Sequence, residues 1–188
     1  IVTRFHEWIG FMIAIIDYGM GNLRSVSKAF EAVGHQAVVT RDARVIGNAS
    51  HVVLPGVGAF GACMDALRAA GLEGPTHDAV GSGRPFLGIC VGMQMLFDES
   101  EEFGHHQGLG LIPGKVVRFP SGMVENGERL KVPHMGWNNV SLKNSPLFAG
   151  IEDGCFLYFV HSYYPQPDDG SLISATADYG GKFAAAIQ

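Results

Sequence analysis

The sequence contains few cysteines, and their spacing does not suggest a covalent or metal-bound framework. The 188 residues include three, Cys63, Cys90 and Cys155. Three is an odd number, and no two of them are spaced as C-x-x-C, whereas a disulfide framework needs paired cysteines and a zinc site needs clustered ligands. We therefore expect no disulfide scaffold, no metal, no cofactor and at least one free thiol.

Long apolar runs and runs of like charge are missing as well. No apolar segment approaches the roughly 20 residues that a membrane span requires, and the N-terminus lacks the layout of a signal peptide. The net charge is −5, without a basic run that would attract nucleic acid or an anionic membrane. These absences predict a cytoplasmic protein whose partners are small molecules or proteins, with no nucleic acid and no membrane.

The two ends of the chain are unusual. The sequence has no methionine at position 1, and Met12 begins the first strand-like run, so we interpret residues 1–11 as an upstream extension and residues 12–188 as the domain. The alternative is that the apolar residues of this extension pack as a short helix. The last residues, KFAAAIQ, stop inside a strand-like run without a turn or a cap. We expect a chain that is cut short.

What is present is enough for a globular α/β domain, since 47% of the residues are hydrophobic and 16% are charged. Strand-like and helix-like patterns alternate, which is typical of a mostly parallel sheet covered by helices. Asn22 is a plausible N-cap of the first helix, and short β-rich runs after Lys115 suggest added antiparallel strands. The expected strands are 12–17, 36–40, 51–54 and 85–89, and the expected helices are 22–33, 60–71 and 92–99.

One cysteine lies in a setting that suggests catalysis. Gly88-Ile89-Cys90-Val91-Gly92 reads G-x-C-x-G, a thiol version of the nucleophile elbow in which a sharp strand-to-helix turn exposes the nucleophile. A helix start lowers the pKa of a thiol through its dipole and its N–H groups. A buried structural cysteine is the alternative, but the two glycines favour catalysis at Cys90, whereas we interpret Cys63 and Cys155 as structural.

Acyl transfer also requires N–H donors for the oxyanion. Val91, which follows the nucleophile, offers one. Gly56 and Gly58, in LPGVGAFG, let the backbone turn a second N–H toward a substrate. The same letters match a G-x-G-x-x-G dinucleotide loop. That fingerprint normally follows the first strand and requires an acidic residue ending the next strand about 20 residues on, whereas residues 73–83 read as helix and loop. Nucleotide binding is the weaker hypothesis.

A cysteine hydrolase needs a histidine base, and eight histidines are available. Six of them lie beside strands, in polar loops or in the extension. His134 and His161 remain. His161 follows an apolar strand in FVHSYY and could face the site, but no carboxylate follows at a spacing that would orient it. A loop residue that shapes the pocket is an equally good interpretation.

Four segments together resemble a known family. They are DYGMGNLRSV, LPGVGAFG, GICVGMQMLF and PHMGWN, with FVHSYY in support. On these the chain is similar to the class I, triad-type glutamine amidotransferases, and within them to the glutaminase subunits of imidazole glycerol phosphate synthases in histidine biosynthesis. The resemblance runs from Met12 to the end. It implies a flavodoxin-like sheet flanked by helices, with a smaller antiparallel sheet and with the family's C-terminal strand and helix missing.

The resemblance implies a reaction and roles for individual residues. The cysteine of the family attacks the side-chain amide of glutamine, ammonia is released, and water hydrolyses the glutamyl thioester to glutamate. Cys90 matches this nucleophile, and Gly58 and Val91 match the oxyanion donors. Several residues match the substrate site. Gly56 forms its turn, Gln94 would hold the glutamine, and the backbone of His161, Ser162 and Tyr163 would bind the α-substituents of the glutamine.

The resemblance also implies a partner, a cyclase subunit with a (β/α)8 barrel, into which the ammonia passes to make imidazole glycerol phosphate and an aminoimidazole carboxamide ribonucleotide. Trp137 could equally be core by sequence alone, and the resemblance favours an interface anchor. The expected interface residues are Asn22, His134, Met135 and Trp137.

The departure from the family concerns the rest of the triad. Members of this family carry a histidine, and a glutamate two residues later, shortly beyond a strand such as KFAAAIQ, and this sequence ends before that point. We expect the 188-residue chain by itself to be a poor glutaminase. The alternatives are a noncatalytic protein that keeps the partner-facing surface, and another elbow-cysteine hydrolase of the DJ-1 type, for which PHMGWN would have no purpose.

Overall fold

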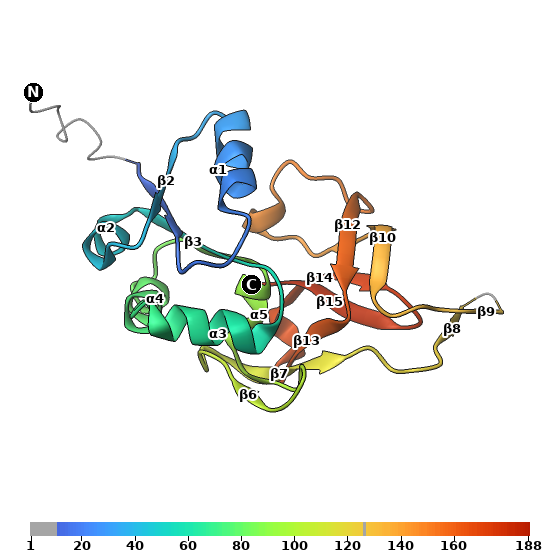
Figure 1. Cartoon of the computed structure of the whole chain (residues 1–188). Helices are drawn as coiled ribbons and strands as arrows, with labels where there is room; N and C mark the ends of the chain where they lie inside the picture. Colours follow the sequence, from blue (N-terminus) through green and yellow to red (C-terminus); the bar gives the residue numbers. More distant parts are fainter. Residues whose placement is uncertain (1–10, 126) are drawn as a thin grey trace, which may run out of the picture. The chain divides into compact units, whose positions relative to one another are not determined.

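The computed structural model describes residues 11–125 and 127–188, which group into two compact units. The first unit runs to Leu96 and includes Gln107–Leu111, and the second comprises Phe97–His106 and Ile112–Gln188. Apart from Phe11, the predicted extension lies outside the described residues. Figure 1 shows the elements along the chain, and each unit is described by itself.

The first unit is built on a parallel sheet whose strand order is β2-β1-β3-β4. Its strands read as apolar runs because helices cover both faces of such a sheet. Ile13, Ile15 and Val53 form a buried cluster against which Val26 and Phe30 of the first helix pack. The strands are β1 (Ile13–Ile16), β2 (Ala37–Thr40), β3 (His51–Gly56) and β4 (Phe86–Cys90).

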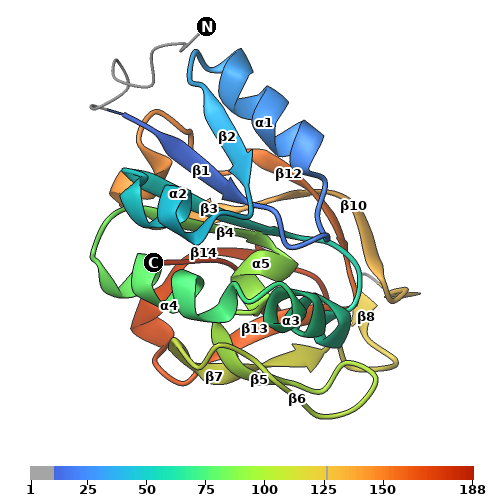
Figure 2. The ribbon, with the colours of Figure 1, turned by 60° about the vertical axis from the view of Figure 1, so that its left-hand side comes forward.

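Five helices belong to this unit. The first, α1, begins after Asn22 as predicted, because the Asn22 Oδ1 atom accepts a hydrogen bond from the Ser25 N–H at 3.2 Å. Figure 2 shows α1 on one side of the sheet and α3 and α4 on the other. Among the described helices, none is both long and apolar enough to cross a membrane. The helices are α1 (Leu23–Ala32), α2 (Ala43–Asn48), α3 (Phe60–Ala69), α4 (Glu73–Gly81) and α5 (Val91–Gln94).

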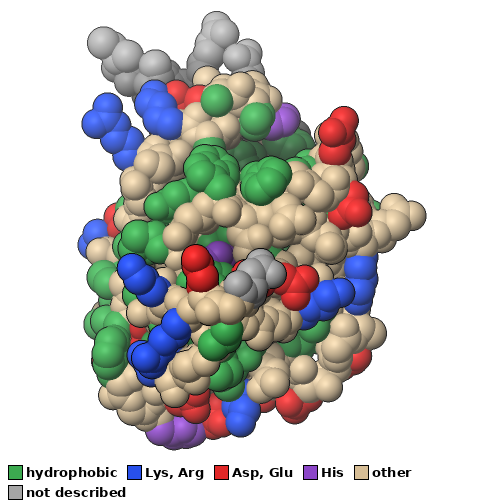
Figure 3. All heavy atoms as spheres, turned by 90° about the vertical axis from the view of Figure 1, so that its right-hand side faces the viewer, with side chains coloured by type: hydrophobic (Ala, Val, Ile, Leu, Met, Phe, Trp, Pro, Cys, Tyr) green, Lys and Arg blue, Asp and Glu red, His purple; other side chains and the backbone are tan. Residues whose placement is uncertain are grey.

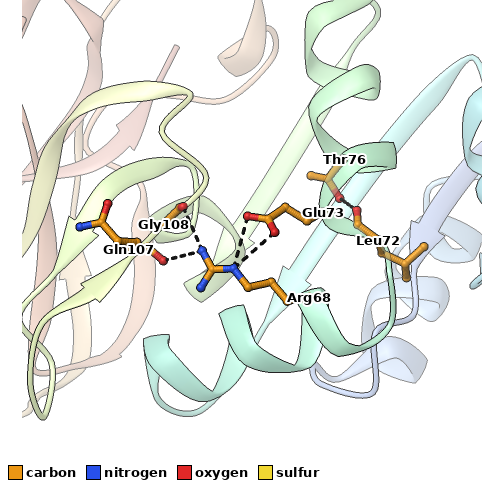
Figure 4. Close-up of polar contacts among 6 residues, drawn as sticks. All are labelled: Arg68, Leu72, Glu73, Thr76, Gln107 and Gly108. Atoms are coloured by element: carbon orange, nitrogen blue, oxygen red, sulfur yellow. Dashed lines mark hydrogen bonds and ion pairs between the residues drawn. The ribbon is translucent and has the colours of Figure 1, made fainter.

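An arginine joins the α3–α4 corner to the segment Gln107–Leu111, as Figure 4 shows. The Arg68 Nε atom lies 3.3 Å from both carboxylate oxygens of Glu73, and its Nη2 atom donates to the carbonyl oxygens of Gln107 and Gly108 at 3.1 and 3.5 Å. A guanidinium group can bind a carboxylate and backbone carbonyls at once because its donors form a rigid fork. Arg68 therefore holds a distant piece of chain against the helices of the first unit.

The second unit consists of strands, as the β-rich sequence after Lys115 predicts. Its sheets have the orders β13-β7-β5-β6, β11-β14-β15, β10-β12 and β8-β9. Phe119, Val140, Ala177 and Phe183 form its buried cluster. The strands are β5 (Phe97–Ser100), β6 (His106–Gln107), β7 (Ile112–Arg118), β8 (Val124–Glu125), β9 (Glu128–Arg129), β10 (His134–Asn139), β11 (Ser141–Leu142), β12 (Phe156–His161), β13 (Tyr163–Pro167), β14 (Ile173–Asp178) and β15 (Lys182–Ile187), with short 3-10 turns at Pro146–Phe148 and Gly170–Leu172.

The prediction of a helix over residues 92–99 is wrong. The helix α5 ends at Gln94, and β5 begins at Phe97, whose partner in the parallel ladder with β7 is Ile112. An apolar run such as MQMLF fits a buried strand or a buried helix equally well, so periodicity cannot separate the two. The pairing with a strand that lies later in the chain decides the outcome. The sequence interpretation also missed the short helix α2.

Candidate active site

Cys90 occupies a strained position at the end of β4. Its backbone angles are φ 56° and ψ −119°, and its side chain is exposed. A positive φ is uncommon for a residue with a Cβ atom, and such strain persists only where the surrounding structure enforces it. A sharp strand-to-helix turn with an exposed thiol is the geometry of a nucleophile elbow.

The glycines around Cys90 are required by close backbone contacts. A Cβ atom on Gly92 would lie 1.9 Å from the carbonyl oxygen of Leu54, and one on Gly88 would lie 2.7 Å from the Cα atom of Met93. Neither neighbour can move away easily, because each is main chain. Only glycine therefore fits at positions 88 and 92 beside this cysteine.

Gly56 brings the end of β3 directly against the elbow. Gly56 is the register partner of Cys90 in the β3–β4 ladder, and a Cβ atom on it would lie 2.5 Å from the amide nitrogen of Gly92. The loop that follows β3 therefore starts at the same edge of the sheet as the thiol. This edge is the carboxyl end of parallel strands, where α/β proteins bind their ligands.

The peptide between Val57 and Gly58 has a fixed direction. The Cys63 thiol, which is fully buried on α3, lies 3.3 Å from the carbonyl oxygen of Val57 and donates to it. Because a trans peptide is planar, the N–H of Gly58 points to the opposite side, away from the buried thiol. Gly58 itself is exposed and has φ +93°, which favours glycine. Its N–H therefore lies on the side of the peptide that faces away from the Cys63 thiol.

Tyr18 holds the end of β3, two residues before Val57. Its buried hydroxyl donates to the carbonyl oxygen of Pro55 at 2.7 Å and lies 3.6 Å from the Sδ atom of Met95. Burial, followed by the influence of Cys63, raises the pKa of Tyr18 well above its usual value, so the hydroxyl keeps its proton. Sequence reasoning missed Tyr18 and assigned Cys63 only to the core. The sequence did offer a signal, because Tyr18 lies just beyond the first strand, at the edge of the sheet where the elbow also lies.

The helix after the elbow is shorter than expected, and this changes the electrostatic argument. Only four residues, Val91–Gln94, form α5, so a long macrodipole is not available to Cys90. The local N–H groups remain, and the N–H of Val91 at the first helical position has no acceptor within the helix. Gln94 is 8% exposed and lies on this short helix. The electrostatic stabilisation available at the elbow therefore comes from individual N–H donors and not from a long helix.

His161 and its neighbours lie in the second unit. His161 ends β12 and Tyr163 begins β13, with Ser162 between them. The Nδ1 atom of His161 is 3.0 Å from the carbonyl oxygen of Tyr163, and its Nε2 atom is 3.0 Å from the Nδ1 atom of His134. Both ring nitrogens are engaged inside the second unit. The interpretation of His161 as a residue that shapes its segment fits this geometry better than that of a base.

His134, one of the expected interface residues, points into the interior of the second unit. Its side chain is 4% exposed and stacks on Tyr179 and Phe159, because the alternation along β10 turns it inward. Burial, and then the neighbouring His161, lower the pKa of His134 from 6.5 to about 4. The side chain of His134 is therefore buried within the second unit, and its place in a partner interface stays a prediction.

The opposite face of the β10–β12 ribbon is apolar and open. Met135 and Trp137 lie opposite Val160 and Tyr158, and Trp137 meets Tyr158 edge to face with ring centroids 5.6 Å apart. The exposed fractions are 61% for Met135 and 70% for Trp137, so the tryptophan is not core. We call Met135, Trp137, Phe156, Tyr158 and Val160 the apolar ribbon face. Figure 3 views the side of the molecule that lies at the right in Figure 1, where β10 and β12 are labelled, and hydrophobic side chains gather on part of this surface.

The structure thus forms two groups of predicted residues. One group lies at the elbow of the first unit and consists of Gly56, Gly58, Cys90, Val91 and Gln94. The exposed Asn22 belongs to the same unit. His161, Ser162, Tyr163 and the apolar ribbon face gather in the second unit. Among residues 11–125 and 127–188, no group of three or more His, Cys, Asp or Glu side chains is placed to hold a metal ion.

Comparison with known proteins assigns this geometry to a family. The family described as "Glutamine amidotransferase class-I" matches residues 14–188. The imidazole glycerol phosphate synthase subunit HisH of Syntrophotalea carbinolica is 62% identical over 177 residues, which cover 94% of this chain and 86% of the relative. The protein of the same name from Geobacter sulfurreducens is 61% identical over 176 residues, covering 93% of this chain and 84% of the relative.

Solved structures agree on the fold. A structure described as "Crystal structure of glutamine amidotransferase" superposes with a TM-score of 0.63 at 15% identity, covering 88% of this chain and 84% of that chain. PurLQS from Thermotoga maritima superposes with a TM-score of 0.63 at 18% identity, covering 91% and 77%. At these identities the likeness concerns the fold alone.

Proposed function

The chain belongs to the class-I glutamine amidotransferases, and on that premise we propose that it hydrolyses glutamine to glutamate and ammonia as the glutaminase subunit of an imidazole glycerol phosphate synthase. The observation that carries this proposal is the elbow at Cys90. Its positive φ and its two sterically required glycines make it a built nucleophile site. The family match extends from residue 14 to residue 188, which supports 12–188 as the amidotransferase domain.

The residues at the elbow can perform acyl transfer in a defined order. The Cys90 sulfur attacks the amide carbon of glutamine, and the N–H groups of Val91 and Gly58 stabilise the oxyanion. Ammonia leaves, and water hydrolyses the thioester to release glutamate and regenerate the thiol. Gln94 is proposed as a substrate-binding residue of the first unit, and the backbone of residues 161–163 as a substrate-binding segment of the second. Both ring nitrogens of His161 already have hydrogen-bond partners, so we do not propose His161 as the general base.

The test is glutamate release from glutamine by the complete gene product, measured alone and with its cyclase partner. Replacement Cys90→Ala removes the nucleophile and is expected to lower kcat by several orders of magnitude, about 10³-fold or more. Cys155→Ala, which removes a half-buried thiol in the second unit, is the matched control and should keep wild-type kcat. Full activity in Cys90→Ala would refute the proposal.

The apolar ribbon face supports a partner. Exposed aromatic and methionine side chains that lie together are typical of interface cores. The relatives are subunits of a synthase, and we propose a heterodimer in which this face, with Trp137 as the anchor, binds a cyclase subunit with a (β/α)8 barrel. Asn22 is proposed as a second contact residue. A cytoplasmic location is proposed because the relatives are named as parts of a biosynthetic enzyme.

A further inference from the structure

A buried histidine, His134, and a half-buried one, His161, face each other across the β10–β12 ribbon. His134 and His161 are register partners, and the Nδ1 atom of His134 lies 3.0 Å from the Nε2 atom of His161. Both histidines lie on the face opposite the apolar ribbon face. The glutaminase chemistry proposed above assigns no function to the two imidazole side chains.

The hydrogen bonds around the pair determine where its protons lie. The Nδ1 atom of His161 faces the carbonyl oxygen of Tyr163 at 3.0 Å, and a carbonyl only accepts, so this nitrogen carries the proton. In the neutral ring, Nε2 of His161 is then an acceptor, and Nδ1–H of His134 donates to it. The Nδ2 atom of Asn138, which donates to the Asp178 carbonyl at 2.7 Å, lies 3.4 Å from the remaining His134 nitrogen. One directional chain results, from Asn138 through His134 and His161 to Tyr163.

The surroundings of the pair keep both imidazoles neutral and fixed. Phe119 and Phe183 contact both rings, and Tyr179 stacks on His134 with ring centroids 4.0 Å apart. The Tyr179 hydroxyl is occupied, since it donates to the carbonyl oxygen of Lys131 at 2.6 Å. The other titratable ring in this cluster is Tyr164, and the flanking Asp178 and Lys182 have exposed side chains. An aromatic environment without an ion partner disfavours the imidazolium form.

We propose that His134 is a positioning residue for the glutamine-binding segment His161–Tyr163. This inference rests on the proposed function, because that function assigns glutamine binding to the segment. The Nδ1–H of His134 fixes the ring of His161, and His161 in turn fixes the carbonyl of Tyr163. His134 is also followed directly by Met135 of the apolar ribbon face, so the chain connects the proposed partner surface to the proposed substrate segment.

The first measurement needs no substrate. Nitrogen-15 NMR of the histidine side chains in the wild-type protein is expected to show His134 and His161 as neutral rings protonated at Nδ1. In His134→Phe, which keeps the aromatic packing and removes both nitrogens, the His161 signals should change tautomer or broaden. A wild-type spectrum with His161 protonated at Nε2 would overturn the proposal, whatever the enzyme does.

The second measurement is glutamine turnover by the complete gene product with the cyclase partner. His134→Phe is expected to raise KM for glutamine about 5- to 10-fold, the equivalent of roughly one hydrogen bond, while kcat changes less than about threefold. His134→Asn places an amide nitrogen near the lost Nδ1 and should restore KM to within about twofold. His105→Asn, an exposed histidine of the same unit, is the control and should have no effect.

The outcomes separate the two proposals. A wild-type complex that releases no glutamate refutes the proposed function, while the NMR spectra still decide the hydrogen-bond chain. An active wild type with unchanged KM in His134→Phe refutes the positioning role alone. Melting temperatures of all variants are measured in parallel, and a folded His134→Asn without recovery of KM would also overturn the proposal.

Discussion

At the scale of single residues, backbone crowding explains the elbow better than side-chain chemistry does. Cys90 is the one residue at the turn that retains a side chain while its φ is positive, and the glycines on both sides absorb the contacts. The Cys63 thiol and the Tyr18 hydroxyl then hold the carbonyls of the adjoining loop from the buried side. The packing and hydrogen bonds around Cys90 thus hold its backbone in the strained conformation.

The crowding at Gly92 predicts a large loss of stability on adding one methyl group. Gly92→Ala would place a Cβ atom 1.9 Å from the Leu54 carbonyl oxygen, and such overpacking is expected to lower the free energy of unfolding by about 2–4 kcal/mol. Gly81→Ala is the control, because that glycine on α4 faces open space, and helix propensity should raise stability by about 0.5–1 kcal/mol. Urea denaturation measures both, and equal effects would contradict the steric argument.

The His134–His161 pair predicts a loss of stability in mild acid. The pKa of His134 is lowered from 6.5 to about 4, mainly by burial, and burial also lowers the pKa of His161. Between these pH values the unfolded chain binds protons that the folded chain does not, so the free energy of unfolding falls as the pH drops from about 6.5 to about 4. Above about 6.5 the pair makes no pH-dependent contribution.

The carboxylates also titrate in this range, so the readout is a difference between variants. Urea midpoints of the wild type and of His134→Phe are measured at a series of pH values. The wild type should lose more stability across the window, since the variant has lost one of the two depressed groups. Parallel curves for the two proteins would show that the histidine pair does not control acid stability.

At the scale of elements, pairing partners decide what local pattern cannot. The run after the elbow became a four-residue helix followed by β5, because Phe97 pairs with Ile112 of β7. The first helix, in contrast, was predictable because Asn22 supplies a local cap. Signals within a few residues specify helix starts, whereas a strand depends on a partner that lies elsewhere in the chain.

The corner between α3 and α4 predicts a modest, localised effect. Arg68→Met keeps the alkyl chain but removes the bonds to Glu73, Gln107 and Gly108. The two charged side chains are 38% and 37% exposed, so water replaces part of the interaction, and the expected loss of unfolding free energy is about 1 kcal/mol.

Hydrogen exchange of residues 107–111 tests the localisation of this effect. These amides should exchange faster in Arg68→Met than in the wild type, because the segment has lost its side-chain anchor. Arg44→Met, which removes a surface pair with Asp42, is the control and should leave both exchange and stability nearly unchanged. Unchanged exchange at 107–111 in Arg68→Met would contradict the anchoring role.

At the scale of the whole molecule, the apolar ribbon face predicts how the protein associates. Trp137 is 70% exposed, so Trp137→Ala should hardly change stability. Trp137 is the proposed anchor of the heterodimer, so the same substitution should raise the Kd for the cyclase partner by about 30-fold or more, or about 2 kcal/mol. Phe103→Ala, which removes a side chain that is 83% exposed, is the matched control. Calorimetric titration with the partner measures both, and equal Kd values would exclude the ribbon face.

The sequence by itself determined the family, the parallel core and the nucleophile, because these depend on local signals: the G-x-C-x-G spacing, the Asn22 cap and the apolar strand runs. Only the tertiary structure decided that His134 faces inward while Met135 and Trp137 face outward, and that Tyr18 and Cys63 hold the loop after β3. The physical reason is that the burial of a side chain and the partner of a polar group depend on residues far away in the chain, which no local pattern specifies.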